Sequence, residues 1–94
     1  MTWTVEYHSF SPTIDLIRHL KDELDNLTET SPYASSIKMI LTRKDNTFQG
    51  ELRVNSTNRK FVSSAKCDSL PELESRLLSE INRQLKEWKY LRAV

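Results

Sequence analysis

The sequence predicts an α+β fold with the element order β-α-β-β-β-α, a four-stranded sheet with two helices packed on one face. Three observations support this prediction. Four segments alternate between apolar and polar residues, which is the period of a half-buried strand. Two longer segments carry apolar residues at the spacing of one helical face. Because each helical segment has a single apolar stripe, both helices are expected to cover the same face of the sheet.

Length and composition indicate a single soluble domain over residues 1–94. Hydrophobic residues make up 37% of the chain and charged residues 29%, a balance typical of a small globular protein. One glycine is too few for a P-loop or a dinucleotide-binding fingerprint. One cysteine, Cys67, excludes an internal disulfide and fits a reducing compartment. The N-terminal segment has no long apolar run, so we expect a cytoplasmic protein.

The first strand and the first helix occupy the N-terminal third of the chain. The strand is predicted over residues 2–8, where apolar and polar residues alternate. The helix is predicted to begin at Ser11 and Pro12, because serine caps helices and proline suits the first helical position. A loop is predicted over residues 28–33. The apolar stripe of the helix consists of Ile14, Leu16, Ile17, Leu20, Leu24 and Leu27.

Three strands follow, over residues 36–42, 48–55 and 61–67. Polar turns at 44–46 and 55–58 separate them and indicate two hairpins. One face of these strands is apolar or small and is expected to be buried: Ile37, Met39, Leu41, Phe48, Gly50, Leu52, Val54, Phe61, Ser63, Ala65 and Cys67.

The last helix is predicted to start at Leu70 or Pro71, because Ser69 and Glu72 have the spacing of a capping box. No glycine stops the helix, so it can run to Leu91 or beyond. Its buried stripe is Leu73, Leu77, Ile81, Leu85 and Trp88. The predicted core of the domain contains Leu20, Leu24, Ile37, Met39, Leu52, Phe61, Leu77, Ile81 and Leu85.

No arrangement of residues indicates catalysis, a metal ion or a cofactor, and we expect that the protein is not an enzyme. His8 and His19 have no second histidine at the spacing of metal ligands, so we interpret both as polar surface residues. Cys67 lies on the buried phase of its strand, which is typical of an inert thiol rather than a nucleophile.

The exposed side of the last helix carries a row of basic and aromatic residues opposite the buried stripe. The row suits contact with phosphates and stacking on bases. It consists of Arg76, Ser79, Arg83, Lys86 and Tyr90, with Lys89 beside it. The alternative is a solvated face held by ion pairs within the helix: Glu72–Arg76, Glu80–Arg83 and Arg83–Glu87.

Two further basic groups lie at the turns, Arg43-Lys44 and Arg59-Lys60. Consecutive antiparallel strands place these two turns at opposite ends of the sheet, so they form separate clusters. Although the net charge is only +1, the first third of the chain is acidic and the middle third basic. This uneven charge favours a localised charged binding surface over nonspecific binding by the whole protein.

The whole chain resembles the ribosome hibernation-promoting factor family, also called ribosome-associated inhibitor proteins, in its order of elements. The stretch from Phe61 to Lys89 resembles the family most. It has an alternating strand of small residues containing Ser64-Ala65, a short polar break, and a long helix containing Arg83-Gln84-Leu85. The length resembles the short form of the family, which lacks a C-terminal dimerisation domain.

The resemblance implies a protein that binds the small ribosomal subunit and its rRNA in the channel used by mRNA and tRNA, and silences idle ribosomes. It implies neither an enzyme nor a cofactor, no small-molecule substrate, no membrane, and a monomer when off the ribosome. Basic helix and loop residues would contact the rRNA. The candidates in this sequence are Arg43, Lys44, Arg59, Lys60, Arg76, Arg83, Lys86, Lys89 and Tyr90.

Two departures from the family pattern shift this expectation toward the last helix and the turns. Ser69-Leu70-Pro71 stands where the family usually has an aromatic residue at the start of the last helix. Glu23 and Asn26 stand where lysines would be expected on the first helix, whose outward face is acidic.

Two other functions stay open at this point. A double-stranded-RNA-binding module has a similar element order, although it carries a lysine cluster at the start of its last helix. Here that position reads Ser69-Leu70-Pro71-Glu72. A protein-interaction module could use the acidic first helix on a basic partner, and its binding would survive ribonuclease treatment.

Overall fold

The computed structural model describes residues 3–57 and 59–92. Thr2 and Asn58, which the sequence analysis assigns to a strand and a turn, lie outside this part. The elements confirm the predicted order: β1 (Trp3–His8), α1 (Ile14–Thr30), β2 (Ser36–Lys44), β3 (Thr47–Asn55), β4 (Lys60–Cys67) and α2 (Leu70–Arg92).

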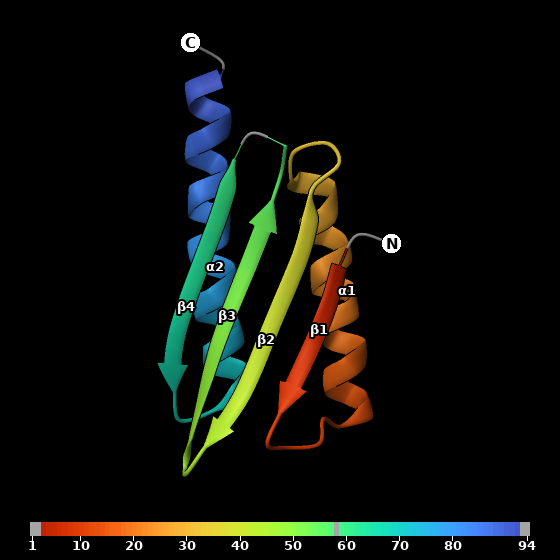
Figure 1. Cartoon of the computed structure of the whole chain (residues 1–94), viewed down its shortest axis with the longest axis vertical. Coiled ribbons are helices and arrows are strands. Elements are labelled where there is room, and N and C mark those ends of the chain that lie inside the picture. Colours follow the sequence, from red (N-terminus) through yellow and green to blue (C-terminus); the bar gives the residue numbers. More distant parts are fainter. Residues whose placement is uncertain (1–2, 58, 93–94) are drawn as a thin grey trace.

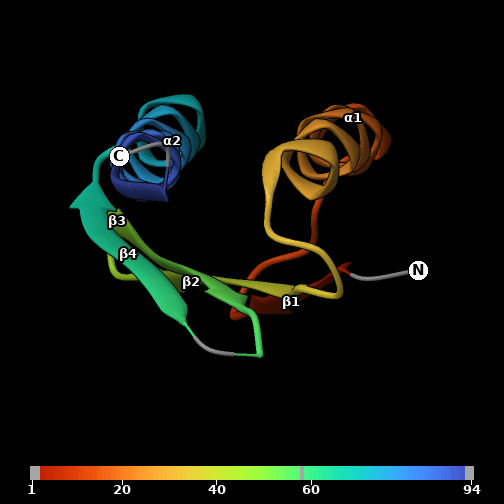
Figure 2. The same cartoon turned by 90° about the horizontal axis from the view of Figure 1, so that it is seen from above.

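The strands form one mixed sheet in the order β1-β2-β3-β4 (Figure 1). β1 runs parallel to β2, and α1 connects the two. β2, β3 and β4 pair antiparallel through two hairpins. Figure 2 shows both helices on the same face of the sheet, as predicted, while the other face carries no helix.

The core lies between the sheet and the two helices. Strand register places apolar side chains opposite one another, with Met39 facing Leu52 and Val54 facing Phe61. All residues of the predicted core are buried, and Cys67 is buried with them. The complete core cluster is Leu20, Leu24, Leu27, Ile37, Met39, Leu41, Leu52, Val54, Phe61, Cys67, Leu73, Leu77, Ile81 and Leu85.

The glycine of the chain, Gly50, lies in the middle of β3, directly below α2. A Cβ atom at this position would lie 2.7 Å from Cδ1 of Leu77 and 3.1 Å from Cδ2 of Leu73. Both leucines are fully buried. The missing side chain therefore lets α2 approach the sheet closely. Glycine is needed here because there is no room for a Cβ atom, and the backbone angles at this position do not require it.

The predicted start of α1 at Ser11-Pro12 is wrong, because Thr13 caps the helix. Its Oγ1 accepts a hydrogen bond from the Leu16 amide at 3.1 Å, and its carbonyl accepts the first helical bond from Ile17 at 3.0 Å. A threonine hydroxyl, like that of serine, can satisfy an otherwise unpaired amide at the start of a helix.

α1 also extends to Thr30, past the point at which the predicted loop begins. Hydroxyl groups near its end bond back to helical carbonyls: Thr28 to Leu24 at 2.8 Å and Thr30 to Leu27 at 3.2 Å. Ser31, the C-cap, does the same to the Leu27 carbonyl at 2.6 Å. These bonds keep polar residues in the last turn of the helix.

The predicted apolar stripe of α1 is too wide. Ile14 is 64% exposed and Ile17 is 46% exposed, whereas Leu20, Leu24 and Leu27 are buried. At about 100° per residue, Ile17 lies roughly 60° and Ile14 roughly 120° from Leu20 around the helix. Only the three leucines and the half-buried Leu16 therefore face the sheet.

α2 begins where the sequence predicts. Ser69 Oγ accepts a hydrogen bond from the Glu72 amide at 3.4 Å, and the Ser69 carbonyl accepts one from Leu73 at 3.1 Å. The predicted stripe faces the sheet, with Trp88 packed against the core at its far end. The C-terminal turns of α2 project past the ends of the strands (Figure 1). Within the described residues, neither helix is long and apolar enough to cross a membrane.

Replacing Leu77 by alanine tests this packing. Leu77 is fully buried above Gly50, so Leu77→Ala is expected to lower the free energy of unfolding by about 2–5 kcal/mol. Leu91→Ala is the matched control on the same helix, because Leu91 is 55% exposed and its loss should stay within about 0.5 kcal/mol. Urea denaturation measures both, and similar small losses would show that the helix phase is wrong.

Candidate nucleic-acid interface

The side of α2 that faces away from the sheet carries the predicted basic row. Arg76, Arg83 and Lys86 are exposed along it, and Tyr90, near its end, is 72% exposed. The opposite side of the same helix is held against the sheet by its buried leucines. The orientation of this row is therefore fixed by the core and does not depend on loops.

Carboxylates on α2 neutralise both arginines of the row. Arg83 binds Glu80 through Nη2 and Oε1 at 2.6 Å and Glu87 through Nη1 and Oε2 at 3.1 Å. Arg76 Nη2 lies 3.0 Å from Glu72 Oε1. All three ion pairs of the alternative interpretation are thus formed. An arginine that is paired with a carboxylate on its own helix attracts an external phosphate less strongly than a free arginine does.

The acidic side of α2 is turned toward the edge strand β4. Hydrogen bonds from Arg83 and Gln84 lower the pKa of Glu80 to about 2. Gln84 Nε2 also donates to the Val62 carbonyl of β4 at 2.8 Å. Glu80 is therefore ionised across the physiological pH range, and it stays paired with the Arg83 guanidinium.

Lys86 and Lys89 lie on the other side of α2, toward the end of α1. They line a groove of about 580 Å³ together with Thr30, Ser79, Asn82, Arg83 and Leu85. Within the described part of the chain, no carboxylate pairs with either lysine. These two lysines are the row's uncompensated cations, and they sit where a polar groove opens.

Arg59 lies close to the C-terminal half of α2, although it is far from it in sequence. Its guanidinium sits 5.8 Å from the centre of the Phe61 ring. Phe61 in turn packs edge-on against Trp88, with ring centres 6.2 Å apart. This chain of ring contacts places Arg59 at the same end of the molecule as Lys89 and Tyr90.

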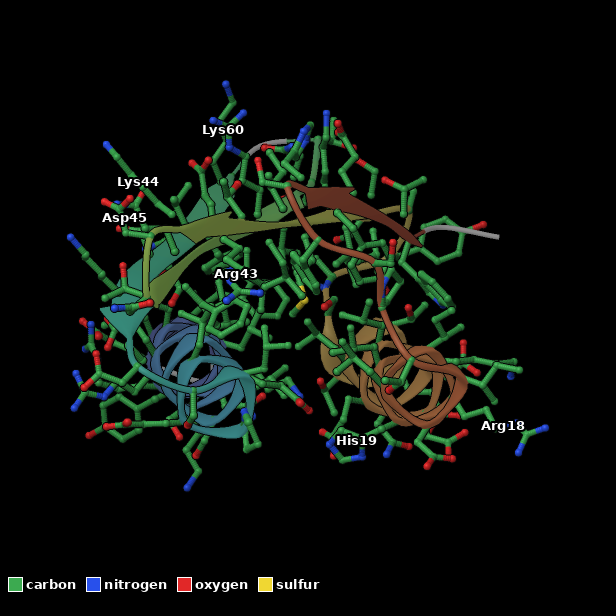
Figure 3. The ribbon with its side chains drawn as sticks, turned by 90° about the horizontal axis from the view of Figure 1, so that it is seen from below. Arg18, His19, Arg43, Lys44, Asp45 and Lys60 are labelled. Carbon is green, nitrogen blue, oxygen red and sulfur yellow. The ribbon has the colours of Figure 1, made fainter. Side chains whose placement is uncertain are left out.

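The other turn lies at the opposite end of the sheet, as predicted (Figure 1). Arg43 points to the helix side and donates from Nε to the Asp45 carbonyl at 3.4 Å, whereas Lys44 points the other way (Figure 3). The structure therefore brings Arg59, Lys86, Lys89 and Tyr90 toward one end and places Arg43 and Lys44 at the other. Lys60 lies at the same end as Arg59 but points away from the helices (Figure 3).

α1 presents an acidic face whose lysine is already paired. Lys21 Nζ lies 2.9 Å from Asp25 Oδ2, and this hydrogen bond raises the pKa of Lys21 and lowers that of Asp25. Asp25 also accepts a hydrogen bond from Trp3 Nε1 at 2.8 Å. Arg18 points away from the rest of the molecule (Figure 3). Charge compensation on α1 thus agrees with the expectation that this helix is not the basic surface.

One polar contact between the two helices was not predicted from the sequence. His19 on α1 contacts Glu74 on α2, with 2.5 Å between Nε2 and Oε1, so it is not merely solvated. Glu74 is 7% exposed, and burial raises the pKa of its carboxyl. The only hint of this contact in the sequence is the one-turn spacing of His19 and Glu23 on α1. That spacing does not identify Glu74 on α2 as the partner of His19.

No protein-family model matches the sequence, and no curated protein sequence matches it significantly. Solved structures do match. A ribosomal subunit interface protein from Coxiella burnetii has a TM-score of 0.79 at 15% identity, covering 96% of this chain and 99% of its own. The N-terminal domain of Thermus thermophilus Protein Y has a TM-score of 0.79 at 13% identity, covering 94% of this chain and 99% of its own. The chain therefore has the fold of these two proteins over nearly its whole length.

Proposed function

We propose that this protein binds the small ribosomal subunit, contacts its rRNA in the channel used by mRNA and tRNA, and silences translation of idle ribosomes. One observation carries the proposal: a protein of this fold, matched over nearly the full length of both chains, is a ribosomal subunit interface protein. The fold match is accompanied by a basic groove and an exposed tyrosine at one end of the molecule.

The mechanism would be occlusion rather than catalysis. The domain measures 45 × 24 × 18 Å, an elongated body with helices on one side and the open face of a twisted sheet on the other. Such a body can fill a channel lined by RNA. Lysine and arginine contacts to phosphates would hold it in place, and they would release counterions as they form.

The end of the molecule that carries the C-terminus of α2 is the proposed centre of RNA contact. Lys86 and Lys89 would bind phosphates, because no carboxylate in the described part of the chain competes for them. Tyr90 is exposed enough to stack on an unpaired base. Arg59 would add a third cation nearby. Arg76, Arg83, Arg43, Lys44 and Lys60 would contribute less, because they are paired, lie at the other end or point away from the helices.

Sedimentation of a stationary-phase lysate through a sucrose gradient tests the proposal directly. The protein is expected in the small-subunit and intact-ribosome fractions at low salt and at the top of the gradient at high salt. Purified small subunits should reproduce this binding, and a cell-free translation reaction with intact ribosomes should slow as the protein is added. Absence from every ribosomal fraction at low salt would refute the proposal.

Paired substitutions locate the interface. Lys86→Ala with Lys89→Ala is expected to weaken binding to small subunits and to reduce the slope of log K against log salt by about two, one for each lost phosphate contact. Arg18→Ala with Lys21→Ala removes the same charge from α1 and is the matched control. It should change little, because its surroundings are acidic and Lys21 is already bound to Asp25. Filter binding at several salt concentrations measures both.

The same comparison separates the alternatives. If the α1 pair is the more damaging, α1 faces the ribosome and the assignment to α2 is wrong. If neither pair of substitutions changes the affinity and the affinity is the same at low and high salt, the protein is instead a protein-interaction module.

Releasing Arg83 should strengthen binding. Glu80→Gln with Glu87→Gln removes both carboxylates that hold the Arg83 guanidinium, so we expect tighter binding and a salt slope steeper by about one. Because the Glu80 pKa is about 2, mild acid cannot produce the same release.

The matched control for this double variant is Glu6→Gln with Glu51→Gln. It changes the net charge equally, but it frees Lys38 and Arg53 on the open face of the sheet. Equal strengthening by both double variants would mean that overall charge governs binding and that the α2 surface has no special role.

A further inference from the structure

The polar cluster of His19 and Glu74 lies in the groove between α1 and α2, away from the basic end. His19 and Glu23 lie one turn apart on α1, and Glu74 faces them from the first turns of α2. Figure 3 shows His19 on the outer side of the helix layer. The groove around this cluster has a volume of about 520 Å³ and is lined by residues of both helices.

The ligand atoms of the three side chains nearly converge. His19 Nε2 lies 2.5 Å from Glu74 Oε1 and 4.0 Å from Glu23 Oε1. One ligand atom from each of the three side chains lies within 4.8 Å of the other two. Ligand atoms about 2.05 Å from a tetrahedral zinc ion are roughly 3.3 Å apart. Side-chain shifts of roughly 1–2 Å in His19 and Glu23 would therefore reach that geometry.

We propose that His19, Glu23 and Glu74 form a binding site for a divalent transition-metal ion, with Zn²⁺ as the preferred ion. One imidazole nitrogen and two carboxylate oxygens form a mixed ligand set that suits Zn²⁺. Mg²⁺ and Ca²⁺ prefer larger sets made of oxygen alone. Water in the open groove would complete the coordination.

Burial and charge both support the site. Glu74 is nearly buried, and a buried carboxylate needs a compensating charge or hydrogen bonds. The imidazole of His19 supplies one contact, but Glu23 brings a second negative charge into the same space. A bound dication would neutralise both carboxylates at once, which a single histidine cannot do.

The ion would also link the two helices. His19 and Glu23 belong to α1 and Glu74 to α2, so each bound ion joins elements that are far apart in sequence. A ligand that binds the folded state alone stabilises it by mass action. At Zn²⁺ concentrations a hundredfold above Kd, Tm is therefore expected to rise by roughly 10–20 °C.

Calorimetric titration with ZnCl₂, together with thermal melts, tests the site in the purified 94-residue protein. The parent protein should bind one Zn²⁺, and Mg²⁺ at equal concentration should leave Tm unchanged. His19→Gln and Glu23→Gln should each weaken Zn²⁺ binding roughly tenfold or more. Glu23 is only half-buried on α1, so its variant keeps the test valid if a change at the buried Glu74 impairs folding.

His8→Gln is the matched control. His8 Nε2 also lies near a glutamate, 3.4 Å from Glu6 Oε1, but the pair is on β1 and is not part of the His19 cluster. This variant should bind Zn²⁺ as the parent does. X-ray absorption of the zinc-loaded protein should show nitrogen and oxygen ligands without sulfur, which excludes binding through Cys67.

Three results would overturn the proposal: no Zn²⁺-dependent rise in Tm, unchanged affinity in His19→Gln and Glu23→Gln, or sulfur in the coordination shell. The cluster would then be an ion pair that joins two helices. None of these measurements involves ribosomes, so their failure would leave the proposed ribosome binding untouched, and the reverse also holds.

Discussion

The close packing of α2 onto the centre of the sheet is the contact on which the rest of the structure depends. It is possible because Gly50 leaves room for Leu73 and Leu77 above β3. Once these leucines are seated, the rotation of α2 about its axis is settled. Its exposed row, its acidic side toward β4 and its lysines toward α1 all follow from that rotation. The candidate interface is thus a consequence of how the core is filled.

The fold could be predicted because its periodicities are clear and mutually consistent. Strand alternation and two apolar stripes determine which faces are buried, and every predicted core residue is buried. The boundaries of α1 were less predictable. Ser11 and Thr13 can both cap a helix, and the choice depends on which hydroxyl reaches a free amide. Ile14 and Ile17 look like core residues in sequence, yet the helix turns them away from the sheet.

The candidate site was predictable only in part, because charge compensation depends on side-chain geometry. Sequence spacing places Arg83 and Lys86 in one row and allows ion pairs along it. It does not determine which of these cations are paired with a carboxylate in the folded protein. In the structure Arg83 is held by two carboxylates and Lys86 faces a groove instead. The contact between His19 and Glu74 joins two helices whose relative placement only the folded sheet provides.

The bond from Gln84 to the Val62 carbonyl has a consequence for the protein at high concentration. β4 is an outer strand of the sheet, and outer strands invite another chain to add to them, which can begin aggregation. Here a helix side chain already occupies a carbonyl of that strand, and Lys60, Lys66 and Arg59 place positive charge along it. A chain that added to this edge would have to displace that hydrogen bond and approach these positive charges, so β4 is protected against edge-to-edge pairing.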